Sequence, residues 1–154
     1  MLYKENHWQR RLSEMSALGG SLVFLSIALS FALLGNIDRA MFLVSGYLLT
    51  YLIAAPLRLG FFKERPEKRQ YKNLFERLDA ASFPSIHAQR AVFLAVTLAG
   101  YFKNTGLTVL FLLLAGLVCY SRVALRKHHL SDVLAGSVLG AAVYYLLPVI
   151  MGLL

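Results

Sequence analysis

The sequence predicts an all-α protein: a polytopic membrane helix bundle of about five transmembrane helices with an N-terminal interfacial segment. Apolar residues make up 58% of the chain and charged residues 16%, whereas soluble domains average roughly 45–50% and about 25%. The apolar residues are gathered in uncharged runs, and four of these runs have 18 residues or more, close to the roughly 20 that cross a bilayer. At 154 residues, the chain is expected to form one membrane-embedded domain, residues 1–154.

The first uncharged run, Met15–Ile37, has 23 residues. It is too long for a signal-peptide core and has the length of a spanning helix. Residues 1–14 precede it and combine Trp8 with two arginines, Arg10 and Arg11. Aromatic and cationic side chains favour the headgroup layer, so this segment is expected to lie along the interface and remain in the mature protein.

The third run, Ala91–Phe102, has only 12 residues. It can span only if its helix starts near Ser85 and takes His87 and Arg90 into a polar, protein-lined mouth. We expect this arrangement because the polar clusters on either side of the run must then share one side of the membrane. The predicted spans are about 15–37, 40–57, 85–103, 104–122 and 131–154.

Five alternating spans place 14 of the 16 Lys and Arg residues on one side of the membrane, with Arg39 and Lys103 on the other. The positive-inside rule assigns the cationic side to the cytoplasm. Some of these cations are expected to serve chemistry instead, so the side of the site is left open. The formal charge of +8 could suggest nucleic acid, but acidic residues are interspersed with the basic ones. The expected partners are membrane lipids and no nucleic acid.

Two features of the apolar runs are assigned to packing. The single cysteine, Cys119, excludes a disulfide framework and a cysteine-based metal site. Gly136 and Gly140 form a small-xxx-small pattern on the last run, which favours close packing within the bundle over dimerisation.

Three polar clusters on the cationic side carry candidate chemistry. In the first, Arg58 and Arg65 are seven residues apart, which predicts one side of a helix about two turns long, before Pro66 turns the chain out. The alternative is a pair of arginines that extend to the headgroups. Lys63 and its basic neighbours are assigned to a solvated loop.

The second cluster, Pro84 to His87, has the residues of a helix start. Ser85 would there offer its hydroxyl and nearby backbone N–H groups to an anion. His87 is an ionisable group at the membrane boundary, which favours a functional role over a structural one.

The third cluster joins the last two runs and contains Ser121, Arg122, His128, His129 and Asp132. If a helix begins here, the spacing of four places His128 and Asp132 on one face, where the carboxylate would fix the imidazole tautomer. Such a histidine can act as a base, an acid or a nucleophile. Arg126, Lys127 and His129 fit an ordinary basic turn.

Together the clusters predict a phosphate site, because phosphoryl transfer needs positioned cations, an in-line nucleophile and an acid for the leaving group. No cluster of Asp and Glu suggests a bound divalent metal, so the mechanism is expected to need no metal and no cofactor.

The clusters resemble the three motifs of the type 2 phosphatidic acid phosphatase superfamily, K-x6-R-P, P-S-G-H and S-R-x5-H-x3-D. The corresponding residues are Arg58-x6-Arg65-Pro66, Pro84-Ser85-Ile86-His87 and Ser121-Arg122-x5-His128-x3-Asp132. Arg58 stands in place of the lysine and Ile86 in place of the glycine. Both replacements bear on the phosphate site and on substrate choice.

The resemblance implies a role for each matching residue. His128 would be the nucleophile that forms a phosphohistidine, and Asp132 would orient it. His87 would protonate the leaving alkoxide and later activate water. The phosphate oxygens would be held by Arg58, Arg65, Ser85, Ile86 and Arg122.

The predicted function is therefore an integral-membrane lipid phosphate phosphatase, in a plasma or inner membrane. Phosphatidic acid, phosphatidylglycerol phosphate, a lipid A phosphate or a polyprenyl diphosphate such as undecaprenyl diphosphate would each fit. The alternatives are a lipid phosphotransferase, in which an alcohol discharges the phosphohistidine, and a catalytically weak lipid-phosphate binder, for which Ile86 is the reason.

Overall fold

The computed structural model describes residues 7–67 and 70–152, and every regular element within them is a helix. The predicted all-α class is confirmed. The elements are α1 (His7–Ala17), α2 (Ser21–Leu33), α3 (Ile37–Gly60), α4 (Leu74–Ala80), α5 (Ile86–Phe102), α6 (Thr105–Ala124) and α7 (Leu130–Ile150). Residues 1–6, which form part of the predicted interfacial lead-in, lie outside the described residues.

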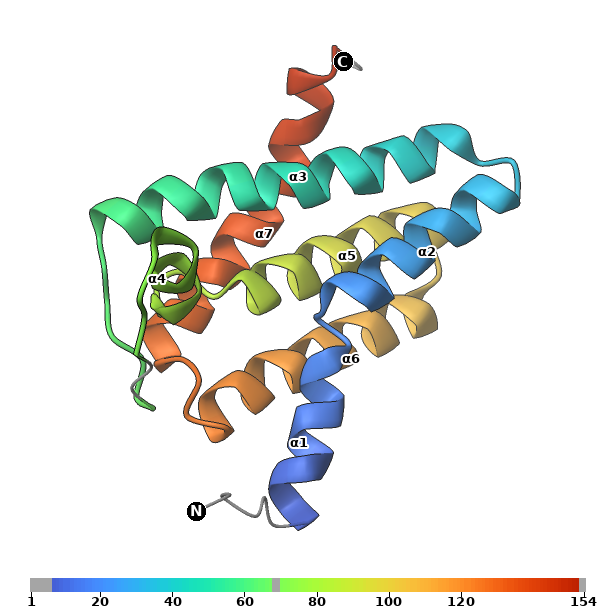
Figure 1. Cartoon of the computed structure of the whole chain (residues 1–154). Coiled ribbons are helices and arrows are strands. Elements are labelled where there is room, and N and C mark those ends of the chain that lie inside the picture. Colours follow the sequence, from blue (N-terminus) through green and yellow to red (C-terminus); the bar gives the residue numbers. More distant parts are fainter. Residues whose placement is uncertain (1–6, 68–69, 153–154) are drawn as a thin grey trace.

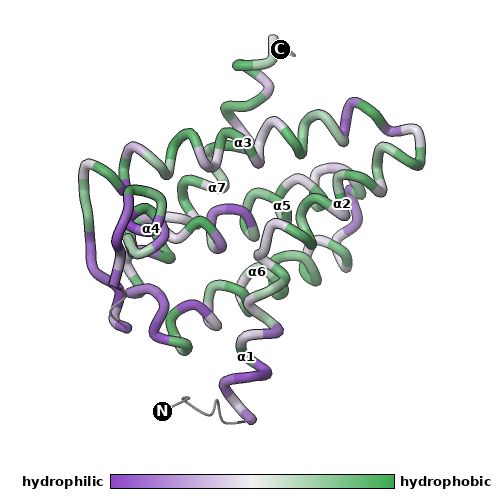
Figure 2. Tube along the Cα trace, viewed as in Figure 1, coloured by the Kyte–Doolittle hydropathy of each residue, from purple (hydrophilic) through white to green (hydrophobic). Residues whose placement is uncertain are grey.

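The outward surfaces of the helices are apolar, as a membrane protein requires. Leu22 is 81% exposed and Leu113 62%, whereas Thr50, Ser85 and Asp132 are each fully buried. In Figure 2 hydrophobic colouring follows the long helices, and hydrophilic colouring gathers in α1 and around α4. Within residues 7–67 and 70–152, four helical segments are long and apolar enough to cross a membrane: His7–Leu33, Ile37–Gly60, Thr105–Ala124 and Leu130–Ile150. The protein is thus a multi-pass membrane protein, and the 1–154 domain assignment stays a prediction.

Helix α5 is the centre of the bundle, packed against α3, α6 and α7 (Figure 1). Ten of its 17 residues are buried. The Phe93 ring stacks between Phe24 of α2 and Phe42 of α3, each with a centroid separation of 6.0 Å. Because neighbouring helices enclose α5, its apolar run does not have to be long enough to match the thickness of the hydrocarbon layer. That α5 crosses the membrane remains a prediction.

The predicted first span is divided into two helices, which corrects the expectation of one continuous helix over Met15–Ile37. α1 ends at Ala17 and α2 begins at Ser21. A Cβ on Gly19 would lie 2.7 Å from Val118 and 3.1 Å from the His87 carbonyl oxygen. The Gly19–Gly20 pair therefore lets the chain bend against α5 and α6, at the level of the second and third clusters.

The Gly136–Gly140 pair brings α7 into close contact with α5, as predicted for packing within the bundle. A Cβ on Gly136 would lie 2.4 Å from the Ser85 carbonyl oxygen, and one on Gly140 would lie 2.2 Å from that of Gln89. Only glycine permits backbones to approach this closely. The start of α7 is thereby held against the start of α5.

Candidate active site

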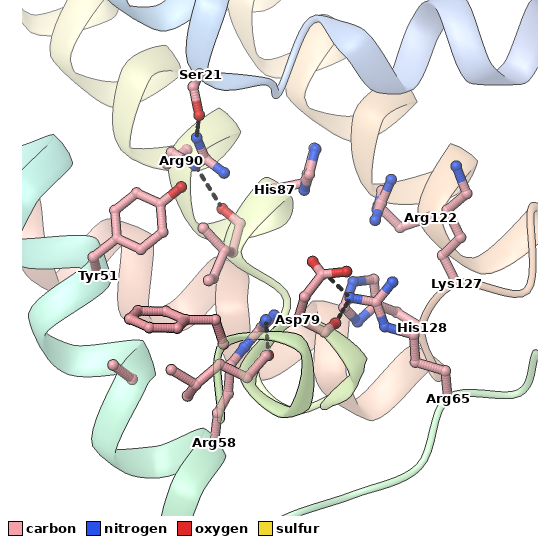
Figure 3. Close-up of a pocket in the computed structure, with 14 residues that line it drawn as sticks. Ser21, Tyr51, Arg58, Arg65, Asp79, His87, Arg90, Arg122, Lys127 and His128 are labelled. Carbon is pink, nitrogen blue, oxygen red and sulfur yellow. Dashed lines mark hydrogen bonds and ion pairs between the residues drawn. The ribbon is translucent and has the colours of Figure 1, made fainter. Parts of the chain in front are cut away.

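The three clusters meet at one end of the bundle, around a cavity of about 600 Å³ (Figure 3). The clusters lie at the ends of three helices. α3 ends just after Arg58, α5 begins just after Ser85, and α6 ends just after Arg122. Six predicted site residues line the cavity, namely Arg58, Arg65, Ile86, His87, Arg122 and His128. Ser85 and Asp132 are fully buried and support the lining residues from behind.

Arg58 and Arg65 both face the cavity, but not from one helix. α3 ends at Gly60, so Arg65 lies in the irregular segment that follows, and the predicted two-turn helix is wrong. Arg58 is 6% exposed and donates hydrogen bonds of 2.9 Å to the Leu78 carbonyl and 2.8 Å to the Pro84 carbonyl. Its Nε has no partner in the part of the chain that the structure describes. Arg58 thus braces α4 and the start of α5 while keeping one buried donor for a ligand.

The other two predicted arginines are buried as well. Arg65 donates to the backbone carbonyl of Asp79, and its guanidinium is 3.8 Å from that residue's carboxylate. Arg122 donates a 2.6 Å hydrogen bond to the Ser16 hydroxyl of α1. Among the described residues, Asp79 is the one carboxylate that lines the cavity. Buried cations are costly without counter-charge, so this cavity favours an anion.

Ser85 occupies the N-cap position of α5, the helix start predicted from Pro84 and Ser85. Its backbone N–H donates a 3.0 Å hydrogen bond to the Asp132 carbonyl, and its buried hydroxyl has no partner among the described residues. Ile86 is the first residue of α5, so its backbone is helical and the missing glycine causes no strain. The N–H groups of this first turn and the Ser85 hydroxyl offer neutral donors to an anion.

His128 is 1% exposed, and its Nδ1 lies 2.7 Å from the backbone carbonyl of Ser82. A carbonyl oxygen only accepts, so Nδ1 carries the proton and Nε2 keeps its lone pair. Burial, and then the charges of Arg122 and Arg65, lower the pKa of His128 to about 3. At neutral pH the imidazole is uncharged and nucleophilic.

The predicted direct contact between Asp132 and His128 is not what the structure contains. α7 begins at Leu130, so His128 precedes the helix and the two side chains do not share its face. Asp132 instead accepts hydrogen bonds from the Ser82 hydroxyl, at 2.5 Å, and from the His129 backbone N–H, at 2.8 Å. Asp132 is therefore linked to His128 through Ser82, whose hydroxyl contacts one and whose carbonyl contacts the other.

Lys63 completes this arrangement with an ion pair of 2.5 Å to Asp132. Lys63 lies in the loop after α3, as predicted, and its side chain is 40% exposed, but its pairing with Asp132 was not predicted. Its backbone carbonyl also accepts a 2.7 Å hydrogen bond from the Ser82 N–H. The loop after α3 is thereby tied to the segment that holds His128.

His87 is half-buried in the first turn of α5 and lines the same cavity as His128. In Figure 3 it lies between Arg90 on one side and Arg122 and Lys127 on the other. Lys127 was predicted to belong to an ordinary turn, but it lines the cavity too. Two histidines thus share one cationic cavity, as the separate roles that the resemblance implies for His87 and His128 require.

Sequence reasoning assigned no role to several residues that shape the site. Ser82 has no motif position, and Ser16 and Ser21 lie in an apolar run. Arg90 was placed in the mouth by its position but given no task. The spacing of three residues between His87 and Arg90 was the available signal, because residues i and i+3 share one face of a helix.

The fold and site define a multi-pass helical membrane protein with an arginine-lined cavity between two histidines. The model of the PAP2 superfamily matches residues 39–153, and the chain belongs to this superfamily. The fold is similar to that of LpxE from Aquifex aeolicus, whose crystal structure matches with a TM-score of 0.76 and 20% sequence identity. The match covers 93% of this chain and 86% of the LpxE chain.

Proposed function

We propose that this protein is a lipid phosphate phosphatase that hydrolyses a terminal phosphate monoester or diphosphate through a phosphohistidine. The observation that carries the proposal is the neutral, buried His128 beside His87 in a cavity lined by Arg58, Arg65 and Arg122. Membership of the PAP2 superfamily and the LpxE-like fold support the same class of reaction.

In the first step, Nε2 of His128 attacks phosphorus while the bond from phosphorus to the leaving oxygen breaks. His87 gives its proton to that oxygen. In the second step, water attacks the phosphohistidine, and His87 accepts a proton from the water. Inorganic phosphate leaves, and both histidines return to their starting states.

The arginines supply the charge stabilisation that the transition state needs. Their guanidinium groups are buried and fixed by backbone and serine oxygens, so they need little rearrangement when charge develops on phosphorus. We propose that this charge, with Lys127, does the work that a divalent metal does elsewhere. Activity is then expected without added metal and in the presence of chelator.

A lipid is favoured over a soluble phosphate ester by an apolar hollow between the same helices. This second hollow, of about 190 Å³, is lined by α2, α5 and α6. Residues of α2 and α5 also line the first cavity. An amphiphile could keep its phosphate among the arginines and its tail in this hollow.

The test is phosphate release from a panel of lipid phosphates by the detergent-solubilised protein. Wild type is expected to release phosphate from at least one lipid, without added metal, and His128→Asn is expected to release none. Orthovanadate, which mimics five-coordinate phosphorus, is expected to inhibit. A strict metal requirement would refute the metal-free mechanism, and no release from any lipid would leave lipid-phosphate binding as the function.

A further inference from the structure

Arg90 is a buried cation in the cavity that belongs to none of the three motifs. It is 4% exposed and lies in α5, one turn beyond His87. It lines the same cavity as the motif residues. A buried arginine is costly to maintain, so its retention in this position calls for a counter-charge.

The partners of Arg90 within residues 7–67 and 70–152 are neutral. Its Nη1 donates a 2.6 Å hydrogen bond to the Ser21 hydroxyl, and its Nε lies 3.4 Å from the Ile86 carbonyl. The guanidinium lies 5.3 Å from the ring centre of Tyr47 and 5.2 Å from that of Tyr51. These contacts fix the orientation of the guanidinium but leave its charge without a carboxylate.

The position of Arg90 places it on the leaving-group side of the reaction. Ser85 and the first-turn N–H groups lie at the start of α5, His87 follows, and Arg90 comes one turn further along. In Figure 3 Arg90 and His128 lie on different sides of His87. If His128 attacks and His87 protonates the leaving oxygen, the leaving group extends from His87 towards Arg90.

We propose that Arg90 forms a second anion subsite, which binds a phosphate carried by the leaving group. This rests on the proposed phosphatase function and gives the substrate class: a lipid diphosphate, whose leaving group is a lipid monophosphate. With a simple monoester, the leaving group is an uncharged alcohol and Arg90 has nothing to bind. A diphosphate instead places one phosphate among Arg58, Arg65 and Arg122 and the other against Arg90.

The chemistry of the step balances without a further reactant. His128 forms a bond to the terminal phosphorus, and the bridging P–O bond breaks. The bridging oxygen leaves on the lipid monophosphate and takes the His87 proton. Arg90 forms charge-assisted hydrogen bonds to that departing phosphate, and water then releases inorganic phosphate from His128.

The experiment compares farnesyl diphosphate with farnesyl monophosphate, which share one tail, in detergent micelles. The variants are Arg90→Met and Arg90→Lys. The control is Arg39→Met, since Arg39 also lies over a tyrosine ring, at 5.5 Å from Tyr101, but lines a different cavity. Initial rates are measured as phosphate release. The lipid products are separated, so that conversion of the diphosphate to the monophosphate is counted apart from conversion of the monophosphate to the alcohol.

Wild type is expected to prefer the diphosphate in kcat/KM. Arg90→Met is expected to lower kcat/KM for the diphosphate by roughly 10- to 100-fold, the effect of a hydrogen bond between charged groups, and to leave the monophosphate nearly unchanged. Arg90→Lys is expected to restore part of the diphosphate rate, and Arg39→Met to match wild type on both substrates.

Three results would overturn the subsite. The first is an equal loss on both substrates in Arg90→Met and Arg90→Lys, which indicates a structural role. The second is a wild-type preference for the monophosphate. The third comes from phosphatidylglycerol phosphate, added to the panel as a further substrate: an Arg90-dependent preference seen only with this lipid, whose second phosphate is a diester further along the molecule. If wild type releases phosphate from no lipid at all, the proposed function itself fails.

Discussion

His128 is held by the backbone of Ser82, through a 2.7 Å hydrogen bond from Nδ1 to the carbonyl oxygen. The Ser82 hydroxyl in turn donates to the buried carboxylate of Asp132. The tautomer of the imidazole therefore depends on a main-chain group, and Asp132 contributes by positioning the segment that carries it.

Asp132→Asn is expected to lower kcat only about 10- to 100-fold, the cost of weakening hydrogen bonds to a charged group. Where a carboxylate holds the imidazole directly, the same change costs roughly 10⁴-fold in serine proteases. Steady-state kinetics on a lipid substrate measures the difference. Ser137→Ala is the control, because among the described residues that hydroxyl contacts only the Val133 carbonyl of α7 and the Cys119 thiol of α6. A loss near 10⁴-fold in Asp132→Asn would contradict support through Ser82.

Gly136→Ala is expected to lower both stability and activity, because the added Cβ would lie 2.4 Å from the Ser85 carbonyl. α7 must then move away from α5, which separates the segments that carry His128 and Ser85. The cost of such overpacking is about 1–3 kcal/mol, measurable as a lower thermal transition in detergent. Gly116→Ala in α6 is the matched control, since nothing lies within 4 Å of its added Cβ. Equal behaviour of the two variants would contradict the close packing of α7 on α5.

Stability is expected to fall with pH below about 6.5, partly through His128. Its pKa is lowered from 6.5 to about 3 by burial and by Arg122 and Arg65. Between these values the unfolded chain binds a proton that the folded protein does not, so the contribution of His128 is lost at up to roughly 1.4 kcal/mol per pH unit as pH falls. His128→Asn keeps a donor for Ser82 but has no such titration. Its thermal transition should therefore decline less than that of wild type between pH 7 and 5, and parallel declines would refute the lowered pKa.

Much of the fold could be predicted from the sequence because the apolar runs are long and the charges are gathered between them. Spacing along the chain also brought the three clusters to one side. Contacts between segments could not be predicted in this way. The break at Gly19–Gly20 depends on packing against Val118 and His87, and Lys63 meets Asp132 only after the chain has folded.

The candidate site likewise combines residues that could be predicted from the sequence with residues that could not. Arg58, Arg122 and His128 were found from their motifs, and the structure brings them to one cavity. Arg65 was expected on a helix, but the chain leaves α3 at Gly60, where the apolar run has already ended. Ser82 escaped notice because it contributes a backbone carbonyl, which every residue has.

The central claim is that His128 forms a covalent phosphoenzyme, and trapping that intermediate tests it most directly. The protein is mixed with a lipid phosphate labelled with ³²P on the terminal phosphate, quenched in alkaline denaturant and separated from lipid. Wild type is quenched at a series of short times after mixing, because His87 serves both steps and its loss would slow formation of the intermediate as well as its hydrolysis. Label that is stable to alkali and labile to acid is expected on wild type and absent from His128→Asn. Label that persists in His128→Asn, or phosphate release by wild type with no label at any quench time, would contradict the account.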